Sequence, residues 1–258
     1  MVVELLEIFG SDLTVVNAAR VSFAKEVQVM EEKDIKLLNY LAKHNHISPF
    51  FHPQIRFRLK MPIFVAREWY RHQIGLSRNE VSRRYVFPDP KDRGTSCASD
   101  RRSGAHVDSA VECWIPALED LRARDPKLKQ GSKNEVVADA SVVHLQIKEA
   151  TESAIATYES LLASGVAPEI ARVVLPQSMY TEFIETGSLA AYSRICSLRL
   201  DPAAQKEIRV YADLVDQALL KAFPHSWKAL RAKFANADLV PVKKDIVSPQ
   251  YPDLNYII

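Results

Sequence analysis

The apolar positions of this chain follow two periods, one typical of strands and one typical of helices. Residues 2–8 are mostly apolar, and over 55–61 apolar residues alternate with basic ones. Both patterns predict strands, and the second strand should carry a cationic outer face. A further strand is predicted at 179–185. The chain is therefore expected to contain a small sheet.

Apolar residues three and four positions apart predict helices over most of the remaining chain. These helices are expected at 12–23, 31–43, 62–74, 132–165 and 168–175, from about 188, and beyond 202. Asp12 should cap the first helix, which would bury Phe23, and a capping box from Ser132 to Glu135 should start the longest one. Strands and helices mix without regular β-α-β alternation. The predicted fold is α+β, a single domain over 1–258 with a small mixed or antiparallel sheet packed by several long helices.

Two segments fall outside this pattern. Residues 88–132 lack periodicity and are rich in Pro, Asp, Ser, Arg and Lys, so we expect an irregular excursion with a short helix near 115–123. Residues 238–258 are expected to form a C-terminal tail. No internal repeat and no domain linker is evident.

Composition narrows the class of protein. With 47% apolar and 26% charged residues the chain has the balance of a soluble globular protein, and a net charge of +2 means that any anion site must come from local clusters. The 7 glycines form no phosphate-cradling motif, so a nucleotide would be held by side chains. The 3 cysteines show no C-x-x-C spacing, and the N-terminal residues lack the features of a signal peptide. We expect a cytoplasmic protein that neither enters a membrane nor binds nucleic acid.

The densest group of polar side chains lies between residues 71 and 85, beginning on a predicted helix and leaving it near Gly75 for a loop. Four arginines and a histidine occur there. A solvated basic turn would account for the arginines alone. Asn79, Glu80 and Ser82 add the acceptors and neutral donors that a loop needs to grip a base as well as a phosphate.

These residues resemble the signature of the flavin-dependent thymidylate synthases, which is Arg-His-Arg, a short spacer, and Asn-Glu-x-Ser-x-Arg-Tyr. Here the corresponding stretches are Arg71-His72-Gln73 and Asn79-Glu80-Val81-Ser82-Arg83-Arg84-Tyr85. Other family-like segments follow in the family's order: Ala18-Ala19-Arg20-Val21-Ser22-Phe23, His44-x-His46-x-Ser48-Pro49-Phe50, Ala66-Arg67-x-Trp69, Ala171-Arg172-x-x-Leu175-Pro176 and Leu198-Arg199. On the basis of these matches, the chain resembles that family.

Some positions depart from the family pattern. Gln73 stands where the signature has Arg, and the spacer before Asn79 is one residue longer than usual. Glu68 occupies a position where many members carry Gln, and Phe51 one where many carry Glu. An ionised carboxylate at position 68 would repel a nucleotide phosphate.

The resemblance implies a function and its cofactors. The implied reaction is reductive methylation of dUMP to dTMP, with methylenetetrahydrofolate as one-carbon donor, FAD as hydride carrier and NADPH as reductant. It also implies a homotetramer whose sites are shared between subunits. All these ligands are anionic, which suits the arginine clusters.

The resemblance also implies site residues. It places dUMP against Glu68, Trp69, Tyr70, Arg71, Glu80, Val81, Ser82, Arg83, Arg84, Arg172 and Arg199. It places FAD against Ser48, Arg71, His72, Gln73, Glu80, Ser188, Leu189, Ala190 and Arg194. Arg172 is expected to reach the nucleotide from a neighbouring subunit.

Arg199 has a catalytic role in this interpretation. Carbon 5 of uracil is a poor nucleophile, and a fixed guanidinium beside N3 would stabilise the electron-rich, deprotonated ring. A cation near the end of a helix, favoured by the helix dipole, is the plainer explanation of the same residue. Ser82 has no predicted base nearby and is assigned hydrogen bonding to the nucleotide. No cysteine lies in a motif typical of a thiolate nucleophile.

A metal site is not expected. His44, His46 and His52 could in principle ligate zinc, but no cysteine or carboxylate with ligand spacing accompanies them. His144 is expected to be a satisfied core residue, and Cys196 a small hydrophobe.

Two alternatives remain open from the sequence. One is a module that binds single-stranded nucleic acid through the arginines and aromatic residues of 69–85. The other is a degenerate family member that binds flavin and nucleotide without turnover, which Gln73 and Glu68 suggest.

Overall fold

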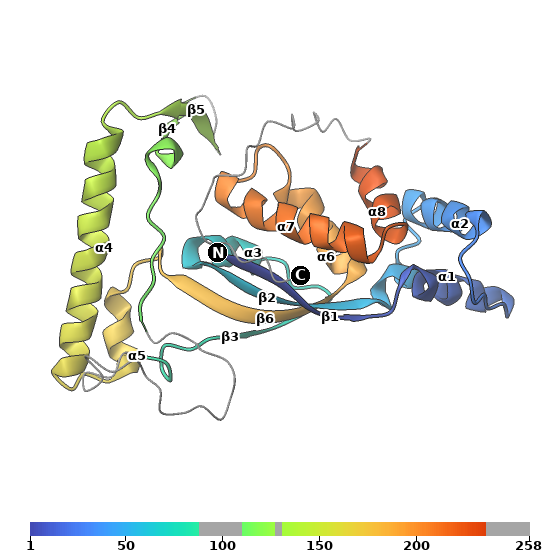
Figure 1. The fold of residues 1–258 in the computed structure, drawn as a ribbon, viewed down its shortest axis with the longest axis horizontal. Helices are drawn as coiled ribbons and strands as arrows, with labels where there is room; N and C mark the ends of the chain where they lie inside the picture. Colours follow the sequence, from blue (N-terminus) through green and yellow to red (C-terminus); the bar gives the residue numbers. More distant parts are fainter. Residues whose placement is uncertain (88–109, 127–130, 236–258) are drawn as a thin grey trace. The chain divides into compact units, whose positions relative to one another are not determined.

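The computed structural model describes residues 1–87, 110–126 and 131–235 and divides into two compact units (Figure 1). Unit 1 comprises Met1–Leu59, Arg67–Asn79 and Phe183–Ile258, and unit 2 comprises Lys60–Ala66 and Glu80–Glu182. The boundary falls inside strands and a helix, so no linker separates the units. The single domain over 1–258 stays a prediction, and the tail at 238–258 lies outside the described residues.

A four-stranded sheet has the order β1-β2-β6-β3. Its strands are β1 (Val2–Phe9), β2 (Gln54–Pro62), β6 (Tyr180–Ser188) and β3 (Leu76–Glu80). The Leu189 amide donates to the Pro53 carbonyl at one end of β2, and the Ile63 amide donates to the Met179 carbonyl at the other. β2 and β6 are therefore antiparallel, as expected for an α+β fold with a small sheet.

The alternating pattern of β2 is confirmed. Its apolar positions are fully buried: Ile55, Phe57, Leu59 and Met61. On the opposite face Arg56 pairs with Glu7 at 2.8 Å. Arg58 pairs with Glu4, also at 2.8 Å. The predicted cationic face exists, but carboxylates of β1 neutralise these two arginines.

Helices supply the rest of unit 1. They are α1 (Asp12–Arg20), α2 (Glu32–Lys43), the end of α3 (Ile63–Trp69), α6 (Leu189–Arg199), α7 (Lys206–Ala222) and α8 (Ser226–Ala235). Figure 1 shows α7 beside β1 and α6, while α8 contacts α2 and α6. Ile208, Tyr211 and Val215 of α7 are buried as the sequence predicts. α8 was not predicted.

Two expectations about the first helix are wrong. Ser11 is the N-cap, and Asp12 lies in the first turn at 7% exposure, where its carboxylate accepts the backbone amides of His225 and Ser226 at 2.9 and 2.8 Å. Phe23 is 77% exposed because α1 ends at Arg20 and a short 3-10 turn, closed by left-handed Ala24, follows. Asp12 is thus tied to the start of α8, a contact that local sequence cannot reveal.

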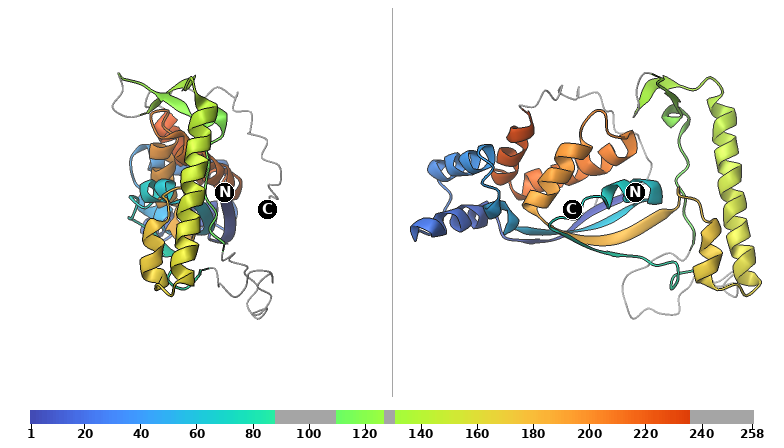
Figure 2. Two further views of the ribbon diagram at one scale, coloured as in Figure 1. Left: turned by 90° about the vertical axis from the view of Figure 1, so that its left-hand side faces the viewer. Right: turned by 180° about the vertical axis from the view of Figure 1, so that it is seen from behind.

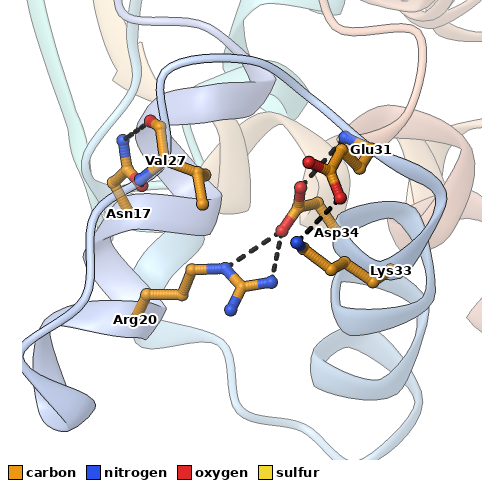
Figure 3. A network of polar contacts seen from close by, with 6 residues as sticks. All are labelled: Asn17, Arg20, Val27, Glu31, Lys33 and Asp34. Carbon is orange, nitrogen blue, oxygen red and sulfur yellow. Dashed lines mark hydrogen bonds and ion pairs between the residues drawn. The ribbon is translucent and has the colours of Figure 1, made fainter.

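The connection between α1 and α2 is fixed by a polar network (Figure 3). The Asn17 side chain exchanges two hydrogen bonds with the Val27 backbone, each 2.9 Å. Asp34 is fully buried, pairs with Arg20 and accepts the Glu31 amide at 3.0 Å. Burial alone would raise the pKa of Asp34, but the bonds from Glu31 and Arg20 outweigh burial and lower it.

Unit 2 contains α4 (Ala140–Ala163), α5 (Pro168–Ala171) and a two-stranded ladder of β4 (Arg122–Arg124) and β5 (Ser132–Val136). α4 and α5 lie side by side (Figure 2). The predicted capping box is wrong, because Ser132 belongs to β5, whose pairing with β4 removes 132–136 from the helix. Tyr158 is the one fully buried apolar side chain of α4.

The irregular excursion is only partly described. Residues 88–109 and 127–130 lie outside the described part, so their conformation stays a prediction. The helix expected near 115–123 is reduced to one 3-10 turn, Leu118–Asp120, because β4 begins at Arg122.

Replacing Asp12 by Ala should lower the free energy of unfolding by about 1–3 kcal/mol, since two amides at the start of α8 lose their acceptor. Urea titration measures this. Asp213→Ala is the matched control, because exposed Asp213 accepts from Gln217 in the next turn of its own helix. Equal losses in the two variants would contradict the assigned role of Asp12.

Candidate functional site

The signature segment adopts a strand where the sequence suggested a loop. α3 ends at Trp69, earlier than predicted, and β3 runs from Leu76 to Glu80. The turn between them needs Gly75, whose φ is +75° and whose added Cβ would lie 3.1 Å from the Ser188 hydroxyl. The Ser188 amide donates to the Gly75 carbonyl at 3.1 Å and so joins β3 to β6. Pairing with a distant strand overrides the polar, loop-like composition of 76–80.

The predicted site residues fall into two groups, one in each unit. Unit 1 holds Ser48, Glu68, Trp69, Tyr70, Arg71, His72, Gln73, Ser188, Leu189, Ala190, Arg194 and Arg199. Unit 2 holds Glu80, Val81, Ser82, Arg83, Arg84 and Arg172.

In unit 1, Arg199 is held by two residues at or beyond the end of α3. Its Nε donates to Nε2 of His72 at 3.0 Å, and its Nη2 donates to the Glu68 carbonyl at 3.1 Å. Nη1 lies 3.5 Å from Oε1 of Glu68. All three nitrogens are engaged, yet a guanidinium has five N–H groups, so two remain for a ligand. The Glu68 carboxylate, expected to repel a phosphate, is paired with Arg199.

His72 serves as a neutral acceptor in this arrangement. Burial first, and then the charges of Arg199, Arg78 and Arg194, lower its pKa from 6.5 to about 4. Because Nε2 accepts from Arg199, the ring proton belongs on Nδ1. A protonated His72 would lose this contact and repel the guanidinium.

A second arginine of unit 1 is held by a buried carboxylate. Nε of Arg78 pairs with Glu185, whose side chain is fully buried. Nε1 of Trp69 donates to both oxygens of Glu185, at 3.1 and 3.2 Å. Burial raises the pKa of Glu185, while Arg78 and Trp69 oppose the rise. Trp69 is therefore in the core, with its one donor used by Glu185, and it offers no stacking surface for a base.

The pair of Glu185 and Arg78 was not predicted from the sequence. One signal was available: buried positions alternate along β6, and Glu185 falls in register with Thr181 and Phe183. A carboxylate at an inward position needs a buried partner. Which arginine supplies the partner depends on the β3–β6 pairing.

The remaining flavin-side residues differ in accessibility. Ser188 is buried and caps α6, accepting the Ala191 amide at 3.2 Å, so the predicted helix start is confirmed. Leu189 and Ala190 are buried in the first turn of α6. The exposed members of the group are Ser48, Arg71, Gln73 and Arg194.

In unit 2, Glu169 brings two predicted nucleotide-binding arginines to one place. Nε of Arg84 lies 3.5 Å from the Glu169 carboxylate, and Nε of Arg172 donates to its carbonyl at 3.3 Å. Both arginines are exposed. The Tyr158 hydroxyl is buried without a hydrogen-bond partner among the described residues. Burial raises the pKa of Tyr158, and the charge of Arg172 is among those that oppose the rise. Two exposed arginines from distant segments thus both contact Glu169, one at its carboxylate and the other at its carbonyl.

Other members of this group have local roles. The Ser82 hydroxyl accepts the Arg84 amide at 3.3 Å. Nη2 of Arg83 donates to the Ala110 carbonyl at 3.2 Å. Glu80 accepts from Thr181.

The described cysteines are poor nucleophiles. Burial raises the pKa of Cys196 well above its usual value, and it raises the pKa of Cys113 as well. Cys97 lies outside the described residues. His144 is satisfied by a 2.8 Å contact with the Pro116 carbonyl.

The described residues contain no group of three His, Cys, Asp or Glu side chains placed to hold a metal ion. Within the same residues, no helix combines the length and apolar character required to span a membrane.

Comparison with known proteins gives a consistent result. The family described as "Thymidylate synthase complementing protein" matches residues 4–225. The flavin-dependent thymidylate synthase of Thermotoga neapolitana is 34% identical over 238 residues, 92% of this chain and 94% of that protein. The one from Kosmotoga olearia is 36% identical over 231 residues, 88% of each chain.

Solved structures of a nucleotide methylase are also similar. The UMP/dUMP methylase PolB from Streptomyces cacaoi bound with 5-Br dUMP has a TM-score of 0.72 and 32% identity, over 90% of this chain and 94% of that chain. The same protein with 5-Br UMP has a TM-score of 0.71 and 31% identity, with the same coverage.

The lowered pKa of His72 predicts a pH dependence of stability in the flavin-free protein. Between its unfolded pKa of 6.5 and its folded pKa of about 4, the unfolded state binds the additional proton, so stability falls as pH is lowered through that window. His72→Gln removes this titration. Urea titration near pH 7 and pH 5 should show a smaller loss in His72→Gln than in the parent and in the exposed control His52→Gln. Equal losses in all three proteins would refute the assignment.

Proposed function

Because this chain belongs to the family of flavin-dependent thymidylate synthases, we propose that it methylates carbon 5 of dUMP to give dTMP, with methylenetetrahydrofolate as the one-carbon donor and NADPH as the reductant. The observation that carries the proposal is the guanidinium of Arg199, fixed by His72 and Glu68 with two N–H groups still available.

Arg199 would act on the uracil ring. A guanidinium held beside N3 and its neighbouring carbonyl stabilises negative charge on the ring and so makes carbon 5 more nucleophilic. The neutral His72 orients Arg199 without competing for the ring as a second charge. Both described cysteines have raised pKa values, which favours activation by charge over attack by a thiolate.

FAD is the cofactor of this family and supplies hydride chemistry when bound. The residues of unit 1 fit such a group, because a flavin presents a diphosphate and ring carbonyls to donors. The donors available are Arg71, His72, Gln73 and Arg194, with Ser48 also exposed. Nη2 of Arg78 adds a buried donor without a partner among the described residues.

The 5′-phosphate is assigned to Arg84 and Arg172. Both guanidinium groups are exposed, and phosphate prefers arginines for their multiple donors. In a tetramer with shared sites, Arg172 would reach the phosphate from a neighbouring subunit. The alternative of single-strand binding is less well supported, because Trp69 is buried and Tyr70 packs edge-on against Phe183 at 5.0 Å. Those two rings are engaged within the protein.

A homotetramer with shared sites is part of the proposal. Apolar side chains on α4, within α5 and directly after α5 are more than half exposed: Val142, Leu145, Ile170 and Val173. Exposed apolar clusters are typical of subunit interfaces. Sedimentation at micromolar concentration should show a tetramer, and a flavin-loaded monomer would contradict this part.

The direct test is product analysis with purified protein, FAD, methylenetetrahydrofolate and NADPH. dTMP should form from dUMP, and leaving out any one component should abolish it. A parallel reaction with UMP tests the specificity for the sugar, ribose or deoxyribose, that the PolB complexes raise. Retained FAD and dUMP binding without any product would instead support the degenerate family member.

Arg84→Ala and Arg172→Ala should each weaken dUMP binding by roughly tenfold to a hundredfold, the range for losing a charge-assisted contact. Isothermal titration measures the dissociation constants. Arg56→Ala is the control, since Arg56 pairs with Glu7 in the sheet. If both variants bind dUMP like the control, the phosphate site lies elsewhere.

Arg199→Lys should retain FAD and fold normally but lose most proton release from carbon 5. An ammonium cannot reproduce the forked contacts that Arg199 makes with His72 and Glu68 while also facing the ring. Tritium release from C5-labelled dUMP at saturation, compared with flavin reduction by NADPH, separates the two effects. An unchanged release rate would remove Arg199 from the mechanism, and loss of FAD would make its role structural.

A further inference from the structure

Arg78 lies in the signature spacer and is held in a fixed orientation by its surroundings. Its Nε pairs with Glu185, and its guanidinium carbon lies 5.3 Å from the centre of the Tyr70 ring. Tyr70 in turn packs against Phe183, with 5.0 Å between ring centres. The side chain of Arg78 is 16% exposed to solvent. A guanidinium placed over an aromatic ring and bonded at Nε cannot rotate freely.

Within residues 1–87, 110–126 and 131–235, no hydrogen-bond acceptor engages the opposite edge of the same guanidinium. Nη2 is buried without a partner, and among the described residues no contact engages Nη1. Each of these nitrogens carries two N–H groups. Buried donors without an acceptor are uncommon in folded proteins and call for an explanation.

Glu185 is not the acceptor for Nη1 and Nη2 of Arg78. Its two carboxylate oxygens already receive Nε1 of Trp69 and Nε of Arg78, and its side chain is fully buried. Moving Arg78 toward solvent would leave this carboxylate without its counter-charge. The pair therefore fixes where the unused N–H groups point.

Arg78 and Arg199 belong to the same part of unit 1. The charges of Arg78 and Arg199 both act on His72, and His72 accepts the hydrogen bond from Nε of Arg199. The contacts give the same connection: Glu185 binds both Arg78 and Trp69, and Glu68, the residue before Trp69 in α3, accepts from Arg199 at its carbonyl. Both guanidiniums are therefore held at the end of α3.

We propose that Arg78 is an additional ligand-binding residue of this site, whose Nη1 and Nη2 donate to an anionic or carbonyl oxygen of a planar ring bound beside His72. The inference rests on the proposed function, which supplies two rings with such oxygens, the uracil of dUMP and the isoalloxazine of FAD. A guanidinium edge suits a ring oxygen because its donors lie in one plane.

The competing explanation is that Arg78 only neutralises Glu185. The double variant Arg78→Gln/Glu185→Gln separates the two, because it removes the charge pair without leaving either charge alone. The chain offers a matched control in Arg20→Gln/Asp34→Asn, another pair in unit 1 that joins a mostly buried arginine to a fully buried carboxylate. Figure 3 shows that this control pair belongs to the connection between α1 and α2.

Three quantities are measured for the parent and both double variants: the melting temperature, the dissociation constant of FAD and that of dUMP. We expect both variants to melt at lower temperature, and only the Arg78 variant to lose tenfold or more in affinity for one ligand. Weaker FAD binding identifies the flavin oxygen, and weaker dUMP binding identifies the uracil oxygen. A folded Arg78 variant that binds both ligands like the control overturns the proposal.

Arg78→Lys keeps the test decisive if the double variant does not fold. Lysine preserves the charge beside Glu185 but lacks the planar edge, so the protein should fold and still lose affinity for the same ligand. Parental affinity for both ligands would overturn the proposal. Product formation by the parent tests the proposed function separately, because an inactive parent that binds FAD and dUMP still reports on Arg78.

Discussion

The candidate site depends on one hydrogen bond, from Nε of Arg199 to a neutral His72 at 3.0 Å. Burial and the surrounding arginines keep His72 unprotonated by lowering its pKa to about 4. A neutral imidazole can accept from a guanidinium, whereas an imidazolium would repel it. The backbone carbonyl of Glu68 completes the fixation. Arg199 is therefore oriented before any ligand arrives, which is the condition for electrostatic catalysis by a preorganised charge.

The sheet serves this arrangement by placing charges where apolar residues would otherwise lie. β6 brings Glu185 into the core, where Trp69 and Arg78 satisfy it, and the same strand ends at Ser188, which caps the helix that carries Arg199. A buried Arg–carboxylate pair adds little net stability, since desolvation offsets the attraction. Its effect is on position, because both partners must stay together.

Much of the local structure was predictable, and the reasons are physical. β2 shows strict alternation, and a helix was predicted to start at about Ser188, so both were identified from residues close together in the chain. The errors come from long-range contacts. Ser132 was read as a helix cap because its pairing with β4 is invisible locally. Asp12 resembled a cap as well, yet its partners begin more than two hundred positions away, at His225. For the site, the signature residues were found by resemblance, whereas the Glu185–Arg78 pair required the β3–β6 register.

The central claim is that a fixed guanidinium, and not a thiolate, activates the uracil ring. Intact-mass analysis after incubation with 5-fluoro-dUMP, methylenetetrahydrofolate, FAD and NADPH tests it directly, because fluorine at carbon 5 cannot leave as a proton and any bond between nucleotide and protein persists. The preparation must first release tritium from C5-labelled dUMP. The account predicts an unchanged protein mass. A mass increase equal to the nucleotide, alone or together with the one-carbon folate bonded to carbon 5, and located on a cysteine, would contradict it.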